Sequence, residues 1–269
     1  MGGLLAVNRA SDIPPTFSIL EWKPSDAKNT KPIIFVGKGL VFDSGGYSLK
    51  PGQYMEDMKI DMAGAAAVIG LFYAISKAKL PLYVIGLIPA TDNLIGKSGY
   101  VPGDVIKMHS GLTVEIKNTD AEGRLILADA LSYAKKYSPE LVIDMATLTG
   151  AAIRAIGELA SAVFFKTDKK IKKTLKNSAK LTYERIVEFP LWEEYNEMLK
   201  SSVADLKNIG GLYAGQTTAA KFLENFIQYP WIHLDIAPVA STEKRINYKG
   251  EGGTGEPIRL LFNFLENYI

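Results

Sequence analysis

Short apolar runs alternate with longer helix-like segments along most of this chain. Residues 32–41 and 82–89 are short apolar runs typical of buried strands, and residues 63–77 between them are Ala-rich and long enough for a helix. The same reasoning predicts strands at 141–145 and 231–236 and helices at 125–137, 151–160, 184–201, 217–227 and 258–265. This alternation predicts an α/β fold, a three-layer sandwich in which a mixed, mostly parallel sheet is flanked by helices.

Composition narrows the class of protein. Hydrophobic residues make up 47% of the sequence and charged residues 22%, which is close to the average of globular proteins. The formal net charge is only +2, so nucleic-acid or membrane binding is not expected from charge. The absence of cysteine excludes disulfides and thiolate metal sites. The longest apolar stretch, 63–75, is too short for a membrane span, and residues 1–12 lack a signal-peptide pattern, so we expect a cytoplasmic protein.

Charged residues gather in two segments beside the predicted strands and helices. The first lies between residues 36 and 61, and the second at 118–124, just before a predicted helix. Together they hold Asp43, Asp61, Asp120, Glu122, Lys38, Lys50 and Arg124. Carboxylates can bridge two divalent ions, and such a pair can activate a water and polarise a carbonyl. Because functional residues of α/β sheets collect where strands end, the two segments predict a metal site.

Each segment also has a purely structural interpretation. Residues 43–46 read DSGG, an ordinary turn sequence, and residues 119–122 resemble a helix capping box. Either segment alone is a weak indication of function. Both together, with two lysines nearby, are much harder to explain as turns.

The two segments resemble those of a known family of metallopeptidases. Residues 118–125 read NTDAEGRL, which is similar to the signature octapeptide of the leucyl aminopeptidase family. Residues 37–46, GKGLVFDSGG, and 48–51, SLKP, resemble the first metal-binding segment of that family. Further similarity lies in DMATLTGA, VADLKN and HLDIA, which begin at residues 144, 203 and 233. The resemblance therefore covers nearly the whole chain.

This resemblance implies two divalent ions, zinc or manganese or else magnesium, held by five side chains. Asp43 and Glu122 are expected to bridge the ions, and Asp120 to complete the tightly held first site. Lys38 and Asp61 are expected to complete the second site. A lysine ligand must be a neutral amine, so the pKa of Lys38 must be lowered by the neighbouring dication.

The resemblance also implies the catalytic groups. Lys50 is expected to stay charged and stabilise the oxyanion of the tetrahedral intermediate. Arg124 is similar to the arginine that holds a bicarbonate ion, which acts as the general base. The two histidines, His109 and His233, lie outside the metal segments and are expected to be structural.

The expected substrates are peptides with a free N-terminus, because one metal would anchor the α-amine. Met58, Thr147, Gly150 and Ala237 are candidates for the pocket of the first residue, and Met58 and Ala237 suit a leucine-like side chain. For all four, packing in the core is an open alternative.

The resemblance implies that residues 1–269 form a single catalytic domain of zinc-peptidase-like fold, without the N-terminal domain that family members usually carry. It also implies a homo-oligomer, a trimer or a hexamer. Three alternatives stay open: an inactive truncated domain, a DNA-binding or structural role, and another two-metal hydrolase such as a phosphatase. The near-neutral charge argues against DNA, and the specific octapeptide argues against a phosphatase.

Overall fold

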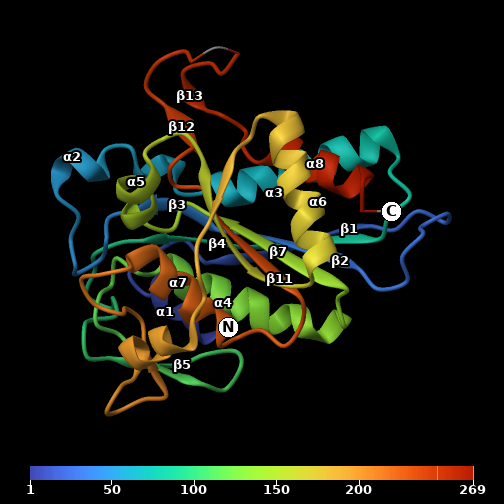
Figure 1. Ribbon diagram of the computed structural model, residues 1–269. Coiled ribbons are helices and arrows are strands. Elements are labelled where there is room, and N and C mark those ends of the chain that lie inside the picture. The colour runs from blue at the N-terminus through green and yellow to red at the C-terminus, as the bar shows by residue number, and fades with distance from the viewer. Residues whose placement is uncertain (247, 269) are drawn as a thin grey trace.

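A mixed sheet with helices on both faces forms the core of the computed structural model, which describes residues 1–246 and 248–268 (Figure 1). The helices are α1 (Gly2–Asn8), α2 (Gly52–Met55), α3 (Ala63–Ala78), α4 (Gly123–Ala134), α5 (Gly150–Ile156), α6 (Lys169–Thr182), α7 (Gly215–Glu224) and α8 (Ile258–Glu266), with 3-10 helices η1 (Met58–Ile60), η2 (Lys135–Tyr137) and η3 (Glu193–Leu199). The strands of the main sheet are β1 (Thr16–Trp22), β2 (Ile33–Gly37), β3 (Gly39–Asp43), β4 (Val84–Asn93), β7 (Leu141–Ala146), β8 (Ser161–Lys166), β9 (Ile186–Glu188) and β11 (Trp231–Asp235). Smaller sheets contain β5 (Val105–Lys107), β6 (Thr113–Glu115) and β10 (Leu206–Lys207), and β12 (Ser241–Thr242) with β13 (Gly252–Gly253).

The main sheet is mostly parallel. Its strand order is β1-β4-β2-β7-β11-β8-β9, and β3 pairs with β4 off this path. Only β1 with β4 and β11 with β8 are antiparallel among the described pairs of this sheet. The predicted mixed, mostly parallel sheet is therefore confirmed.

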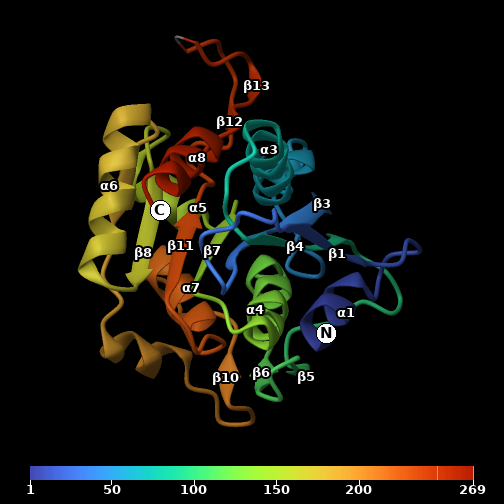
Figure 2. The same ribbon diagram turned by 90° about the vertical axis from the view of Figure 1, so that its right-hand side faces the viewer.

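Helices cover both faces of this sheet, as the three-layer prediction requires. Figure 2 shows α1, α4 and α7 on one face and α3, α6 and α8 on the other. Successive strand residues alternate between the two layers: Val36 and Val142 belong to the core under α4, whereas Phe35 and Ile143 belong to the core under α3. The central strands are therefore buried on both sides, which explains their nearly continuous apolar sequences.

Most predicted elements correspond to observed ones. The helices expected at 63–77, 125–137, 217–227 and 258–265 are α3, α4 with η2, α7 and α8, and the strands expected at 82–89, 141–145 and 231–236 are β4, β7 and β11. The run at 32–41 is instead divided into β2 and β3, because Lys38 leaves the sheet between them.

The helix predicted over 184–201 is wrong. Residues 186–188 form β9, which pairs in parallel with β8, and only 193–199 turn helically, as a 3-10 segment. Pro190 disfavours a continuous helix because it has no N–H and restricts the residue before it. Glu184 is buried and accepts hydrogen bonds from Arg259 and from the backbone N of Leu260, so it anchors this segment to α8.

The helix predicted at 151–160 is too long. It ends at Ile156, and Gly157 follows with a φ of 63°. This positive φ favours glycine and ends the helix. The chain then enters β8, which the sequence pattern did not predict.

The segment Gly52–Ala78 is long and apolar enough, by composition, to cross a membrane. In the structure it is divided into α2, η1 and α3. The apolar face of α3, including Val68, Leu71 and Ile75, is buried against the sheet. This helix therefore serves as a core helix of the α/β fold.

The start of α3 packs directly on the backbone of β2 and β7. A Cβ atom added at Gly64 would lie 2.1 Å from the carbonyl oxygen of Met145, and one added at Gly37 would lie 2.5 Å from that of Gly64. The backbone N of Lys38 donates to the Met145 oxygen at 3.0 Å, and that of Ala65 donates to the Lys38 oxygen at 2.9 Å. The two glycines allow this close approach, which fixes Lys38 relative to the start of α3.

We expect Gly64→Ala to lower the free energy of unfolding by about 3 kcal/mol, because backbone atoms must move to admit the new methyl group. Gly70→Ala, in the same helix, is the control. Among the described atoms its Cβ would meet the flexible side chain of Ile258, with Cδ1 at 2.5 Å and Cγ1 at 3.6 Å, and helix propensity favours alanine. We therefore expect it to change stability by less than about 1 kcal/mol. Urea unfolding of both variants tests this, and equal effects would contradict it.

Candidate metal centre

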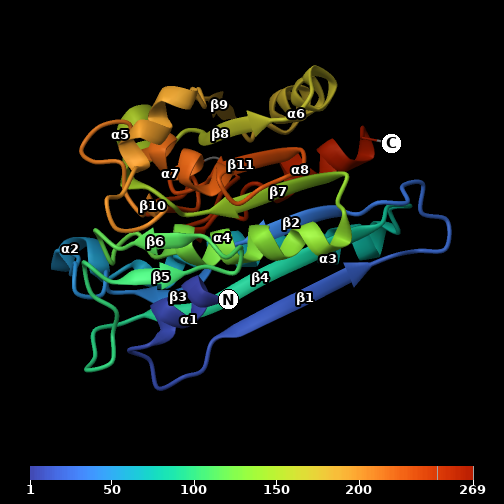
Figure 3. The ribbon, with the colours of Figure 1, turned by 90° about the horizontal axis from the view of Figure 1, so that it is seen from below.

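The predicted site residues meet at the carboxyl ends of the central strands. Lys38 follows β2, Asp43 ends β3, and Asp61 lies between η1 and α3. Asp120 and Glu122 lie in the loop directly before α4. Figure 3 shows α2 and α5 at this same end of the molecule. The topology therefore brings together two sequence segments that are about 80 residues apart, as expected for ligand sites in α/β sheets.

Three carboxylates are close enough to share one ion. Asp43, Asp120 and Glu122 each offer an oxygen, and these oxygens lie within 4.8 Å of one another. Asp61 joins them through Lys38, whose Nζ lies 2.8 Å from Asp61 Oδ1 and 3.0 Å from Glu122 Oε1. The structure thus gathers all four predicted carboxylates in one cluster.

Lys50 lies on the other side of this cluster. Its Nζ is 2.6 Å from Asp120 Oδ1 and 3.0 Å from Asp43 Oδ2. Burial disfavours its charged form, but the nearby carboxylates outweigh burial and raise the pKa of Lys50. It is therefore an ammonium at neutral pH.

The cluster has more negative than positive charge. Four carboxylates face two lysine ammoniums, so the sum would be −4 + 2 = −2 with every carboxylate ionised, and Asp43, Asp61 and Glu122 are at most 4% exposed. Burial, with repulsion from Glu122 and Asp43, raises the pKa of both Asp61 and Asp120. Asp61 Oδ2 and Glu122 Oε2 are buried without a hydrogen-bond partner among the described residues. Oxygen-rich ligands, surplus negative charge and unpaired oxygens fit divalent cations.

Lys38 is held as a cation by these carboxylates. Burial alone would favour the neutral amine, but Asp61, Glu122 and Asp43 outweigh burial and raise the pKa of Lys38. Its third contact is to the backbone oxygen of Thr147, at 2.8 Å. The neutral amine expected of a metal ligand therefore requires a dication that offsets the attraction of the carboxylates.

Arg124 is buried at the start of α4, directly beyond the cluster. Its Nη1 donates to the backbone oxygen of Asn208 at 2.8 Å, and its Nε has no hydrogen-bond partner among the described residues. Burial lowers the pKa of Arg124 to about 10, against the opposing attraction of Glu122 and Asp235. The guanidinium remains a cation at neutral pH and has an unused donor.

Asn93, at the end of β4, orients one carboxylate of the cluster, a role that the sequence analysis missed. It is fully buried, and its Nδ2 donates to Asp43 Oδ1 at 2.8 Å and to the backbone oxygen of Thr119 at 3.1 Å. Thr119 Oγ1 in turn donates to the oxygen of Gly45 at 2.6 Å and accepts from the N of Ser48 at 2.7 Å. These bonds join the two predicted segments. The polar sequence TDN at 91–93 ends the otherwise apolar strand β4, and this was the sequence signal that could have identified Asn93 as a site residue.

Of the four candidates for a substrate pocket, Thr147 contacts the cluster directly. Its hydroxyl donates to Asp61 Oδ1 at 2.7 Å. Met58 lies in η1, three residues before Asp61, Gly150 begins α5, and Ala237 follows β11. Met58, Thr147 and Ala237 are partly buried and Gly150 is exposed, so none of the four belongs to the fully buried core.

The two histidines lie apart from the cluster. His233 is fully buried and hydrogen-bonds Asp144 Oδ1 through Nδ1 at 2.6 Å, while Trp231 donates to the other oxygen of Asp144. His109 hydrogen-bonds the hydroxyl of Ser132 at 2.9 Å. Each thus has one hydrogen-bond partner outside the cluster, while the buried Nε2 of His233 has none among the described residues.

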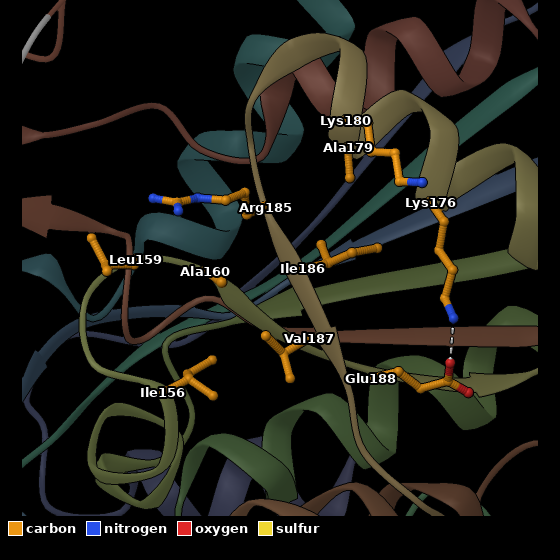
Figure 4. A pocket seen from close by; sticks show the side chains of 10 residues that line it. All are labelled: Ile156, Leu159, Ala160, Lys176, Ala179, Lys180, Arg185, Ile186, Val187 and Glu188. Carbon is orange, nitrogen blue, oxygen red and sulfur yellow. Dashed lines mark hydrogen bonds and ion pairs between the residues drawn. The ribbon is translucent and has the colours of Figure 1, made fainter.

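A cavity of about 540 Å³ lies elsewhere, between α6, β9 and the end of α5 (Figure 4). Apolar side chains such as Ile156 and Ile186 line it, and Lys176 and Glu188 form an ion pair of 2.6 Å at its border. Its lining includes none of the predicted site residues. It is therefore separate from the carboxylate cluster.

Known proteins resemble this chain along nearly its whole length. The model of the cytosol aminopeptidase family, catalytic domain, matches residues 1–262. A probable cytosol aminopeptidase of Chlorobium limicola is 52% identical and covers 100% of this chain and 53% of its own length. A probable cytosol aminopeptidase of Geobacter sulfurreducens is 51% identical, and the match covers 99% of this chain and 53% of that protein. The chain thus spans about half the length of the curated relatives it matches.

A solved structure of similar fold is the bottromycin maturation enzyme BotP in complex with Mn. It superimposes with a TM-score of 0.94 at 38% identity, over 99% of this chain and 59% of that one. The match of the family model along residues 1–262, together with relatives that are half identical over the whole chain, shows that this chain belongs to the cytosol aminopeptidase family and contains its catalytic domain.

Proposed function

We propose that this chain carries the active site of a two-metal aminopeptidase, which removes the first residue, preferably leucine-like, from peptides with a free N-terminus. The observation that carries the proposal is the group of Asp43, Asp120 and Glu122, whose oxygens lie within 4.8 Å of one another beside two lysines. The names of the relatives and the family support the reaction class.

Two divalent ions, when bound, supply a Lewis acid for the scissile carbonyl and a nucleophilic water at neutral pH. Asp43 and Glu122 are central in the cluster and suit bridging positions. Asp120, on the Lys50 side, suits the first site, and Lys38 with Asp61 the second. Zinc, manganese and magnesium all accept oxygen ligands, and the manganese complex of a structural neighbour favours manganese.

The lysine and the arginine beside the cluster have separate roles in this proposal. Lys50 is charged and partly exposed, so its ammonium can stabilise the negative charge that develops on the carbonyl oxygen. Arg124 would hold a bicarbonate ion, which would supply the general base, and its unpaired Nε suits an anion at this position. Thr147 keeps Asp61 oriented through its hydroxyl.

The first residue of the peptide is proposed to lie against Met58, Thr147, Gly150 and Ala237. Thr147 connects this pocket to the cluster through its hydrogen bond to Asp61. Met58 lies in η1, Gly150 begins α5, and Ala237 follows β11. We also propose a cytoplasmic protein, in keeping with the relatives named cytosol aminopeptidases. A homo-oligomer, trimer or hexamer, stays a prediction.

Glu122→Gln tests the reaction and the site together. We expect the manganese- or zinc-loaded parent to hydrolyse leucine-p-nitroanilide and the variant to lose at least about 100-fold in kcat/KM, because a neutral amide cannot replace a bridging carboxylate. Glu197→Gln, at a side chain that is 68% exposed, is the control and should match the parent. A folded, metal-loaded parent without activity, or an active Glu122→Gln, would contradict the proposal.

Asn93→Ala tests the orientation of Asp43. We expect the affinity for Mn²⁺ to fall about 10- to 100-fold, because a carboxylate that has lost its hydrogen-bond donor is no longer held toward the ions. Asn225→Ala is the control, since the Asn225 side chain donates to the backbone oxygen of Lys221 in α7 instead. Titration calorimetry with Mn²⁺ gives the answer, and unchanged affinity in Asn93→Ala would refute this role.

A further inference from the structure

The loop between β10 and α7 presents two adjacent large apolar side chains to solvent. Leu212 is 86% exposed and Tyr213 is 75% exposed. Among the large hydrophobic residues that the structure describes, no other is more exposed than Leu212, and Leu181 alone equals Tyr213. The loop before them contains Gly210 and Gly211, and Gly211 has a φ of 109°. Two neighbouring apolar side chains at the tip of a loop offer an apolar surface that a binding partner can cover.

The first end of this loop is attached to the proposed metal centre. Asn208 is fully buried, and its Oδ1 accepts from the backbone N of Lys117 at 2.8 Å, while its Nδ2 donates to the oxygen of Asn118 at 2.6 Å. Its own backbone oxygen accepts from Arg124 Nη1 at 2.8 Å. The loop therefore begins beside the segment 118–124.

The second end is attached to α5. A Cβ added at Gly215 would lie 2.9 Å from Cβ of Ala151, and Ala214 accepts a hydrogen bond from the backbone N of Thr218 at 2.8 Å. Residues 209–214 thus span from Arg124 to the start of α5, next to Gly150 of the proposed first-residue pocket. Figures 1 and 3 show the segment before α7 at the end of the molecule where α2 and α5 lie.

We propose that Leu212 and Tyr213 bind apolar side chains of the peptide substrate from its third residue onward. This inference rests on the proposed function. The first residue is held at the cluster, and an extended peptide advances by about 3.3 Å per residue. The second residue therefore passes the anchored base of the loop near Asn208, and the next ones reach its tip.

The chemistry of the tip specifies the kind of peptide. The leucine and the aromatic ring supply apolar area, and neither carries a charge to attract an acidic or basic side chain. Because both ends of the loop are fixed, little conformational entropy is lost when a peptide lies against it. The site therefore favours longer peptides with apolar third residues over short or polar ones.

The double variant Leu212→Ser/Tyr213→Ser tests this with three substrates: Leu-Gly, Leu-Gly-Gly and Leu-Gly-Leu. For the parent, we expect kcat/KM to be about 10-fold higher for Leu-Gly-Leu than for Leu-Gly-Gly, the factor that partial burial of one leucine side chain gives. In the variant this ratio should fall to about 1, mainly through KM. The rates for Leu-Gly and Leu-Gly-Gly should remain within about 2-fold of the parent.

The matched control is Leu181→Ser/Tyr183→Ser, which removes a second exposed pair, 75% and 60% exposed, at the end of α6. It should keep the preference of the parent, so a general loss of surface apolar groups cannot explain the result. An unchanged preference in the Leu212/Tyr213 variant, or a parent without preference, overturns this inference while the proposed function stands. A metal-loaded parent that cleaves none of the three peptides overturns both.

Discussion

The structure depends on one electrostatic constraint: four carboxylates are gathered at the ends of the central strands, where two lysines contact them and Arg124 lies beyond. Buried like charges repel one another, and isolated ions are costly to take out of water. Such a group is stable only where cations lie at hydrogen-bond distance and the backbone prevents the carboxylates from moving apart. Each surrounding element can be understood as meeting one of these two conditions.

Uncharged groups hold the backbone so that the carboxylates cannot move apart. Asn93 at the end of β4 and Thr119 before α4 connect the two carboxylate-bearing segments through hydrogen bonds that add no charge. The glycine contact between Gly37 and Gly64 brings α3 close to β2, so that Asp61, just before α3, lies within reach of Lys38. Charge thus determines what the centre can bind, whereas neutral hydrogen bonds and close packing determine where its ligands lie.

Much of this arrangement was predictable from sequence because its signals are local. The apolar runs predicted the central strands, and the octapeptide at 118–125 together with the segment at 36–61 indicated the family and the residues of the cluster. The failures occurred where tertiary contacts decide the outcome. Residues 184–201 have a helical composition, but Glu184 is held by α8 and β9 pairs with β8. Asn93 is an ordinary asparagine until the fold brings it to Asp43, and no local pattern identifies its partner.

The contact of Gly37 with Gly64 has a consequence for how such a centre can change in evolution. At this contact no side chain separates the first turn of α3 from β2, so no intervening group there could be varied in size to shift the start of the helix and change the distance between Lys38 and Asp61. A new metal preference must therefore arise through exchange of the ligands themselves or of the residues that hydrogen-bond them. The loop at 209–214, whose tip is exposed to solvent, has no such restriction, so under our proposal its contacts with substrate can change while the carboxylate cluster stays constant.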